Sequence, residues 1–157
     1  MKRTLLLSAV FVVLTLIARA QFQSDIRVTG DPGESVTSPN NAWCIGADGN
    51  TVHAVWRDNR DGNYEVYYNK STDGGATWGA DVRLTNDISS SMEPCIAVSG
   101  QVVHVAWQDD REGSNQVYYK RSADGGATWG DDTRMISTTS EAVQPCLTAS
   151  ENKVCIV

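Results

Sequence analysis

The chain has 157 residues and a net charge of −6, with 13 lysines and arginines against 19 aspartates and glutamates. Because no basic patch is available to neutralise phosphates, neither a nucleic acid nor an anionic membrane surface is expected as its partner. Beyond the N-terminal residues no stretch has a helical period, so the sequence predicts an all-β protein.

The N-terminal 20 residues have the pattern of a signal peptide. Lys2-Arg3 is the positive region, Leu5–Ile17 the apolar core and Ala18-Arg19-Ala20 a small-x-small cleavage site. An apolar core of this length is too short to span a bilayer comfortably, so no membrane span is expected after cleavage. We therefore expect the protein to be exported and to remain in the periplasm, at the cell surface or outside the cell.

The first predicted strand covers Asp25–Thr29, where polar and apolar residues alternate. A similar pattern returns at Asp81–Thr85 and again at Asp132–Ile136. These three segments are expected to be the same strand in successive copies of one repeated unit.

The residues before the second of these segments predict a complete unit of four antiparallel strands. Its strands are expected at Cys44–Ala47, Thr51–Trp56, Tyr64–Lys70 and Asp81–Thr85. Gly49-Asn50 suits a two-residue hairpin turn after the first strand, and the polar residues 57–63 predict a loop after the second. The second strand is apolar on both faces, which is typical of sheets that stack face to face.

Much of this unit recurs 51 positions later. The block Ser71–Trp78 returns as Ser122–Trp129, and Cys44 returns as Cys95 and once more as Cys146. A period of this size indicates a supersecondary unit copied in tandem. The units are placed at 42–85 and 93–136, with the start of a third at 144–157. Four-stranded sheets repeated radially are the blades of a β-propeller, the fold predicted for residues 21–157.

The repeat also predicts how a ring of such units closes. Asp25–Thr29 is a fourth strand that precedes any complete unit, so we expect it to complete the last blade and cover its bare edge. The third unit reaches only its second strand at Val157. Since propellers typically have four to eight blades, the chain is predicted to be a fragment of a longer protein.

The eight-residue block resembles the Asp-box, or BNR repeat, of sialidase-like β-propellers, with the pattern Ser-x-Asp-x-Gly-x-Thr-Trp. Its members here are Ser71, Asp73, Gly75, Thr77, Trp78, Ser122, Asp124, Gly126, Thr128 and Trp129. We call residues 71–78 and 122–129 the first and second box turns. The resemblance implies a six-bladed ring with the box turns on the face opposite the active site.

The residue types of the box turns point to a structural role. The aspartates can accept backbone N–H bonds within the turn, and the glycines supply backbone angles that a side chain would resist. The tryptophans are expected to pack their large apolar area between blades.

A ligand is expected at the other end of the units, where two loops carry charged residues. The candidates are Arg57, Asp58, Arg60, Asp61, Asp109, Asp110, Arg111 and Glu112. Such residues can bind sugar hydroxyls, a carboxylate or calcium, and paired carboxylates can act as acid and base. The same residue types also favour turns for conformational reasons. The spacing of Asp58 and Asp61 is not a calcium-loop pattern, and no metal site or cofactor is predicted.

The histidines and cysteines are expected to be core residues. His53 and His104 are repeat-equivalent and lie in apolar strands. Equivalent cysteines in neighbouring units seldom come within bridging distance, so buried free thiols are expected at Cys44, Cys95 and Cys146. Cys155 falls in one hairpin with Cys146 but not directly opposite it.

Three functions remain open at this point. In sialidases the substrate carboxylate is held by arginines, the first of which lies two residues before the proline of an innermost strand. The corresponding positions here are Asn41, Met92 and Val143, so no catalytic residue is assigned. The favoured function is a non-catalytic exported propeller that binds a glycan or a protein at the cell surface. The alternatives are an exo-sialidase or related glycoside hydrolase with its catalytic residues beyond Val157, and a structural repeat region of a larger surface protein.

Overall fold

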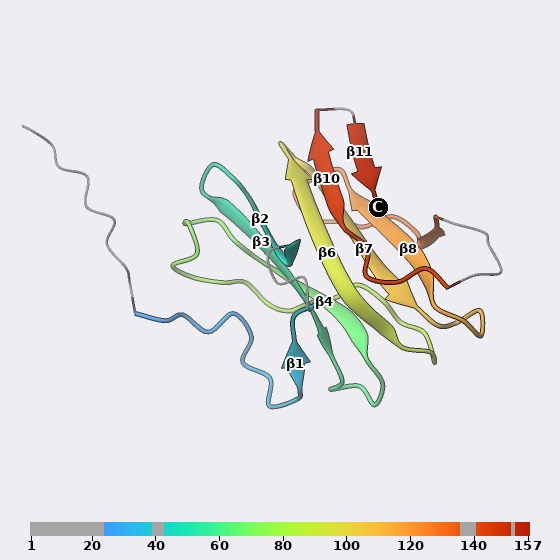
Figure 1. Ribbon diagram of the computed structural model, residues 1–157. Coiled ribbons are helices and arrows are strands. Elements are labelled where there is room, and N and C mark those ends of the chain that lie inside the picture. Colours follow the sequence, from blue (N-terminus) through green and yellow to red (C-terminus); the bar gives the residue numbers. More distant parts are fainter. Residues whose placement is uncertain (1–23, 39–42, 136–140, 152) are drawn as a thin grey trace, which may run out of the picture.

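The computed structural model describes residues 24–38, 43–135, 141–151 and 153–157, and their regular elements are β-strands. The strands form antiparallel sheets, which confirms the all-β class (Figure 1). A search of these residues finds no helix that is long and apolar enough to cross a membrane. The predicted signal peptide, residues 1–20, lies outside the described residues.

The first unit forms one sheet whose strands follow each other in chain order. Its strands are β2 (Ile45–Asp48), β3 (Thr51–Asp58), β4 (Glu65–Ser71) and β5 (Val82–Arg83). A further short strand, β1 (Ser35–Val36), pairs with the far end of β3, opposite Asp58 and Arg57. The first three strands lie within two residues of their predicted positions. The fourth, predicted at Asp81–Thr85, is shorter because only two of its residues pair with β4.

The second unit repeats this sheet. Its strands are β6 (Ser91–Ser99), β7 (Val102–Asp109), β8 (Gln116–Ser122) and β9 (Thr133–Arg134). The registers also repeat, because Val52 lies opposite Ser71 in the first sheet and Val103 lies opposite Ser122 in the second. The innermost strand, β6, is interrupted by a bulge between Met92 and Cys95.

The start of the third unit is a hairpin of β10 (Leu147–Ser150) and β11 (Lys153–Ile156). Leu147 is buried with Cys95, Ala106 and Val117, so β10 covers the outer face of the second sheet. Cys155 lies opposite Thr148 rather than opposite Cys146, as predicted.

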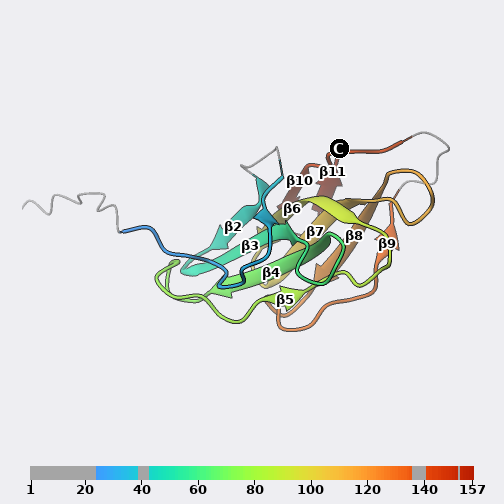
Figure 2. The ribbon, with the colours of Figure 1, turned by 90° about the horizontal axis from the view of Figure 1, so that it is seen from below.

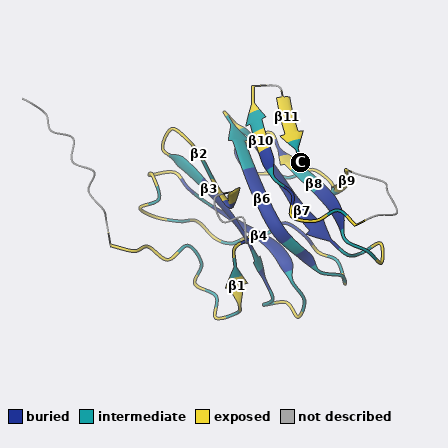
Figure 3. Ribbon diagram, in the orientation of Figure 1, coloured by how far each residue is buried: buried dark blue, intermediate teal, exposed yellow. Residues whose placement is uncertain are grey.

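The main core lies between the first and second sheets, which pack face to face (Figures 2 and 3). The first sheet contributes Cys44, Val55, Val66, Tyr68 and Leu84, and the second contributes Ile96, Val103, Val105, Trp107 and Tyr118. The two sets come from opposite faces of equivalent strands, which is why strands β3 and β7 are apolar on both faces. The predicted stacking of repeat units is therefore confirmed for these two sheets.

The two ends of the sheets have different structures. At one end, which we call the box end, each box turn contacts the first hairpin turn of its own unit. Gly74 N donates to Asn50 O at 2.8 Å, and Gly125 N donates to Gln101 O at 2.7 Å. At the opposite end, the loop end, β3 leads to β4 and β7 leads to β8. The predicted placement of the box turns and the charged loops at opposite ends is correct.

The predicted strand at Asp25–Thr29 is wrong as secondary structure, since the described residues show no strand there. This segment nevertheless contacts the first sheet as residues 81–85 contact the second. Asn69 Nδ2 donates to Val28 O at 3.2 Å, and the equivalent Lys120 Nζ donates to Leu84 O. No described strand pairs with this segment, and its hydrogen bonds with the first unit involve side chains of that unit.

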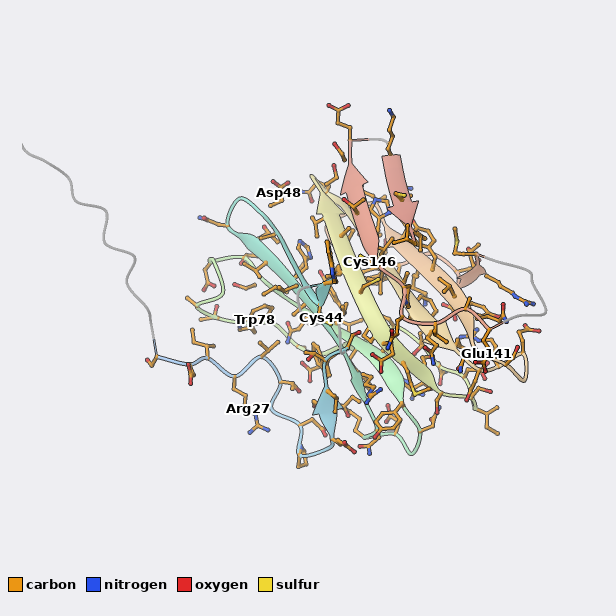
Figure 4. The ribbon with its side chains drawn as sticks, viewed as in Figure 1. Arg27, Cys44, Asp48, Trp78, Glu141 and Cys146 are labelled. Carbon is orange, nitrogen blue, oxygen red and sulfur yellow. The ribbon has the colours of Figure 1, made fainter. Side chains whose placement is uncertain are left out.

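The four cysteines are free thiols. Cys44 and Cys95 are buried, Cys146 is half-buried and Cys155 is exposed, so the expectation of burial holds best for the first two. Cys44 and Cys146 lie on either side of β6 (Figure 4). Burial raises the pKa of the Cys95 thiol to about 12.

Candidate functional site

The charged residues proposed for the loop end lie where β3 and β7 end. Arg57 and Asp58 are the last residues of β3, and Asp109 is the last residue of β7. Arg60, Asp61, Asp110, Arg111 and Glu112 follow in the two loops. The structure therefore brings each loop's candidates together, but it gives all of them partners within the protein.

Asp58 and Asp109 are the centres of two equivalent buried clusters, and each has a side chain that is 0% exposed. Arg60 contacts Asp58 at 2.7 Å, and Arg111 contacts Asp109 at the same distance. The indole nitrogen of Trp56 donates to Asp58 at 3.2 Å, and that of Trp107 donates to Asp109 at 2.9 Å. These aspartates are structural anchors of the loops and have no free oxygen at the surface.

The protonation states of the clusters follow from these contacts. Burial by itself opposes ionisation of Asp58, but hydrogen bonds from Arg60, Ser35 and Trp56 outweigh it and hold the pKa of the carboxyl below its usual range. Burial likewise opposes ionisation of Asp109, but hydrogen bonds from Arg111 and Trp107 outweigh it and lower the pKa of this carboxyl. Both groups are therefore ionised at neutral pH, and neither can serve as a general acid.

The arginines of the clusters are held from several sides. Arg60 also contacts Asp81 at 2.9 Å, and its guanidinium lies 4.2 Å from the centre of the Tyr67 ring. Arg111 contacts Asp132 at 3.0 Å and lies 4.3 Å from the centre of the equivalent Tyr118 ring. Such guanidinium–aromatic contacts add to the ion pairs where water is excluded.

Asp61 and Glu112 also have repeated partners. Asp61 accepts the hydroxyl of Tyr67 and lies 3.0 Å from Arg83. Glu112 accepts the hydroxyl of Tyr118 at 3.0 Å and lies 3.7 Å from Arg134.

The other two candidates are paired with residues of neighbouring segments. Asp110 accepts the backbone N–H of Ser90 at 2.8 Å, and Arg57 donates to Glu93 at 2.6 Å. All eight predicted residues are thus engaged within the protein, and the most exposed of the ion-paired carboxylates among them is Glu112.

The box turns are closed by their own side chains, as predicted. In the first turn, Asp73 accepts the backbone N–H of Thr77 at 2.8 Å and the hydroxyl of Ser71 at 2.6 Å. In the second, Asp124 accepts the N–H of Thr128 at 2.8 Å and the hydroxyl of Ser122 at 2.7 Å. Hydrogen bonds from Ser71 and Thr77 lower the pKa of Asp73 to about 2.

The second box turn also packs against the first unit. The rings of Trp129 and Tyr68 meet edge to face with centroids 5.0 Å apart, and Lys70 Nζ donates to Gly125 O at 2.9 Å. A Cβ at Gly126 would clash with the Tyr68 hydroxyl. The box glycine and tryptophan of the second unit therefore form part of the contact between units.

A polar cavity of about 170 Å³ lies beside this contact, between the box end of the first unit and the second box turn. It is lined by Asp48, Thr51, His53, Lys70, Thr72, Gly100, Gln101, Asp124 and Gly125. His53 is buried and its Nδ1 lies 2.7 Å from the Tyr68 hydroxyl, and His104 lies at the same distance from Tyr119. The prediction that both histidines are core residues is confirmed. Burial, with Lys70 next in effect, lowers the pKa of His53.

The pairing of Asp58 with Arg60 was not predicted, although the sequence carries a signal for it. Trp-x-Asp-x-Arg occurs at 56–60 and at 107–111, in register with the rest of the repeat. A motif that recurs unchanged among variable loop residues indicates a structural contact. Among the described residues, no group of three or more histidine, cysteine, aspartate or glutamate side chains is placed to hold a metal ion.

Comparison with protein-family models and with curated proteins finds no match for this chain.

Proposed function

We propose that the chain is part of an exported, non-catalytic β-propeller of Asp-box repeats, which binds a glycan at the loop end of its sheets. The observation that supports the non-catalytic part of the proposal is that the charged residues of both loops form equivalent sets of internal ion pairs. Asp58 and Asp109 are buried, ionised and held by Arg60 and Arg111. A glycosidase needs one carboxyl that keeps its proton near neutral pH, and neither of these does.

The loop end still offers groups for recognition at its surface. Glu112 has a side chain that is 47% exposed, and Tyr64 is half-buried with the Arg57 guanidinium 5.0 Å from its ring centre. The Tyr64 hydroxyl donates to the exposed carboxylate of Glu34 at 2.9 Å, and an aromatic ring beside a carboxylate suits a ligand with many hydroxyl groups. The predicted N-terminal signal peptide supports the export in this proposal, and the resemblance of the box turns supports the propeller architecture.

Two assays on the whole chain test the proposal. With a fluorogenic α-sialoside we expect no hydrolysis above the buffer rate. On a glycan array the labelled chain should bind a defined set of glycans, and Glu112→Lys should reduce that binding by tenfold or more. Ala76→Lys adds a charge to an exposed position of the first box turn and serves as the control that keeps binding.

The outcomes separate the three functions. Hydrolysis of the sialoside would contradict the non-catalytic proposal and favour a glycosidase. If Ala76→Lys abolishes binding and Glu112→Lys leaves it intact, the ligand binds at the box end, which contradicts the proposed site at the loop end. If no glycan binds, the structural repeat region of a larger surface protein becomes the better account.

A further inference from the structure

The polar cavity at the box end lies at the opposite end of the sheets from the glycan site proposed above. Its floor includes the buried residues His53 and Gly125, and its rim includes the exposed residues Asp48, Thr72 and Gln101. Its volume of about 170 Å³ is what roughly five or six water molecules occupy in the liquid. The cavity therefore has a mouth at the surface and room for a compact polar molecule.

Lys70 brings a positive charge into this cavity that has no counter-charge beside it. The side chain is half-buried, and its Nζ donates to Gly125 O at 2.9 Å. Among the described residues, no carboxylate oxygen lies within 4.0 Å of this ammonium group. The half-buried Arg60, Arg83 and Arg111 each contact at least one carboxylate. Because an ammonium group has three N–H donors, Lys70 keeps two of them for a ligand.

His53 supplies a further donor to the same cavity. Its Nδ1 lies 2.7 Å from the Tyr68 hydroxyl, which lies farther, at 3.5 Å, from its other acceptor, Gly125 O. We therefore assign the hydroxyl as the donor to Nδ1. Burial lowers the pKa of the imidazole, so the ring is neutral at neutral pH and carries its own proton on Nε2. No described residue bonds to Nε2, which leaves this N–H for a ligand in the cavity.

Asp48 supplies the opposite charge. It is the last residue of β2 and lies exposed on the rim of the cavity (Figure 4). No described residue donates a hydrogen bond to its carboxylate or forms an ion pair with it. The other carboxylate of the cavity, Asp124, accepts hydrogen bonds from Ser122 and Thr128 of its own turn. The cavity thus holds one unpaired cation and one unpaired carboxylate that do not contact each other.

The repeat shows that these polar side chains are not required by the fold. The positions equivalent to Asp48, Thr51 and Thr72 in the second unit hold Ser99, Val102 and Ala123. The contact between histidine and tyrosine is nevertheless the same in both units, at 2.7 Å. A sheet of this kind therefore forms without the carboxylate and the two threonine hydroxyls that line the first cavity.

We propose that this cavity binds a small zwitterion, namely a free α-amino acid with a compact side chain. The carboxylate of the ligand contacts Lys70 and His53, and its ammonium group contacts Asp48. Hydrogen bonds in which both groups are charged are the strong ones, so both ends of the ligand are recognised. An anion alone would place a second negative charge near Asp48, and a cation alone would place a second positive charge near Lys70.

Isothermal titration calorimetry of the whole chain with L-alanine, propionate and ethylamine tests the proposal. Propionate lacks the ammonium group of alanine, and ethylamine lacks its carboxylate. L-alanine should bind with a dissociation constant of roughly millimolar or below, since a ligand with so few atoms has a limited affinity. Each of the other two compounds should bind about tenfold more weakly or worse.

The variant D48S/T51V/T72A gives the first cavity the residues that the second unit has at these positions. It should keep the circular dichroism spectrum of the parent and weaken alanine binding by about tenfold or more. Asp48→Asn changes one exposed residue without a partner and should have a smaller effect in the same direction. The matched control is Arg121→Gln, at the position equivalent to Lys70 but outside this cavity, and it should bind alanine as the parent does.

Three results would overturn the proposal. Propionate that binds as tightly as L-alanine would show a simple anion site. An alanine affinity that neither D48S/T51V/T72A nor Asp48→Asn reduces would place the ligand elsewhere. No heat of binding with L-alanine at millimolar concentrations would show that the cavity holds only water.

Discussion

The two box turns have nearly the same sequence and the same internal hydrogen bonds, yet among the described residues only the second packs against another unit. Gly126 and Trp129 lie against Tyr68 of the first unit, whereas a Cβ at Gly75 would meet nothing within 4 Å. Trp78 lies on the side of the first unit away from the second (Figure 4). The box motif therefore has two separable roles. Its own hydrogen bonds close the turn, and its glycine and tryptophan can pack against the preceding unit.

The largest contrast is expected at the box glycines. Gly126→Val should lower the free energy of unfolding by more than about 3 kcal/mol, because the side chain meets Tyr68 in addition to the strain of a positive φ. Gly75→Val has the strain alone and should cost about 1–2 kcal/mol. Urea denaturation of both variants measures the difference, and equal losses would mean that the contact with Tyr68 contributes nothing.

The box tryptophans should show a smaller contrast of the same sign. Trp129→Ala removes the edge-to-face contact with Tyr68 and should cost about 2–3 kcal/mol. Trp78→Ala removes a half-buried ring without that contact and should cost about 1 kcal/mol. Thermal unfolding followed by circular dichroism compares them. A Trp78→Ala variant that is the less stable of the two would contradict the docking role.

His53 should make the contact between units sensitive to pH. Its pKa is lowered by burial and by Lys70, with Asp48 acting in the opposite direction, so the folded state favours the neutral ring. Its contribution to stability is therefore complete above the unfolded pKa of about 6.5 and is lost as the pH falls through the folded pKa.

The measurement is the free energy of unfolding between pH 7 and pH 5 for the parent, His53→Gln and His104→Gln. His53 is more buried than His104, so its replacement should flatten the profile more. A profile that His53→Gln leaves unchanged would assign the pH dependence to other groups.

No difference between the two box turns is expected when their aspartates are replaced. Asp73→Asn and Asp124→Asn each weaken a turn closed by its own side chains, so the two should lower Tm by equal amounts. The lowered pKa values of both carboxyls mean that their stabilisation is present above about pH 4 and is lost at lower pH. Unequal shifts in Tm would show that docking also depends on the aspartate.

Sequence periodicity predicted most of the strands, because apolar and polar residues alternate along them and turn residues separate the strands of each unit. It missed β1 because Ser35 and Cys44 are nine positions apart, whereas their counterparts Ser91 and Cys95 are four apart. That insertion splits one innermost strand into β1 and β2 and hides the equivalence of Ser35 with Ser91. Their shared role became visible only in space, where Ser35 donates to Asp58 and Ser91 donates to Asp109.

At the loop end, composition predicted which residues gather but not what they do. Polar loops and buried ion-pair clusters use the same residue types, and only burial distinguishes Asp58 from a ligand-binding aspartate. The ion pair between Arg57 and Glu93 could not be predicted from the sequence either, since the residues are 36 positions apart and meet through the bulge of β6.

The unequal exposure of the four thiols gives the protein a built-in attachment point. Cys155 is exposed, whereas Cys95 is buried and has a pKa of about 12, so it offers almost no thiolate at neutral pH. A maleimide dye should therefore react first at Cys155, on the strand β11 that lies at the edge of its hairpin. The fluorescence of that dye would then change when another segment or protein binds beside β11, and no cysteine would need to be introduced.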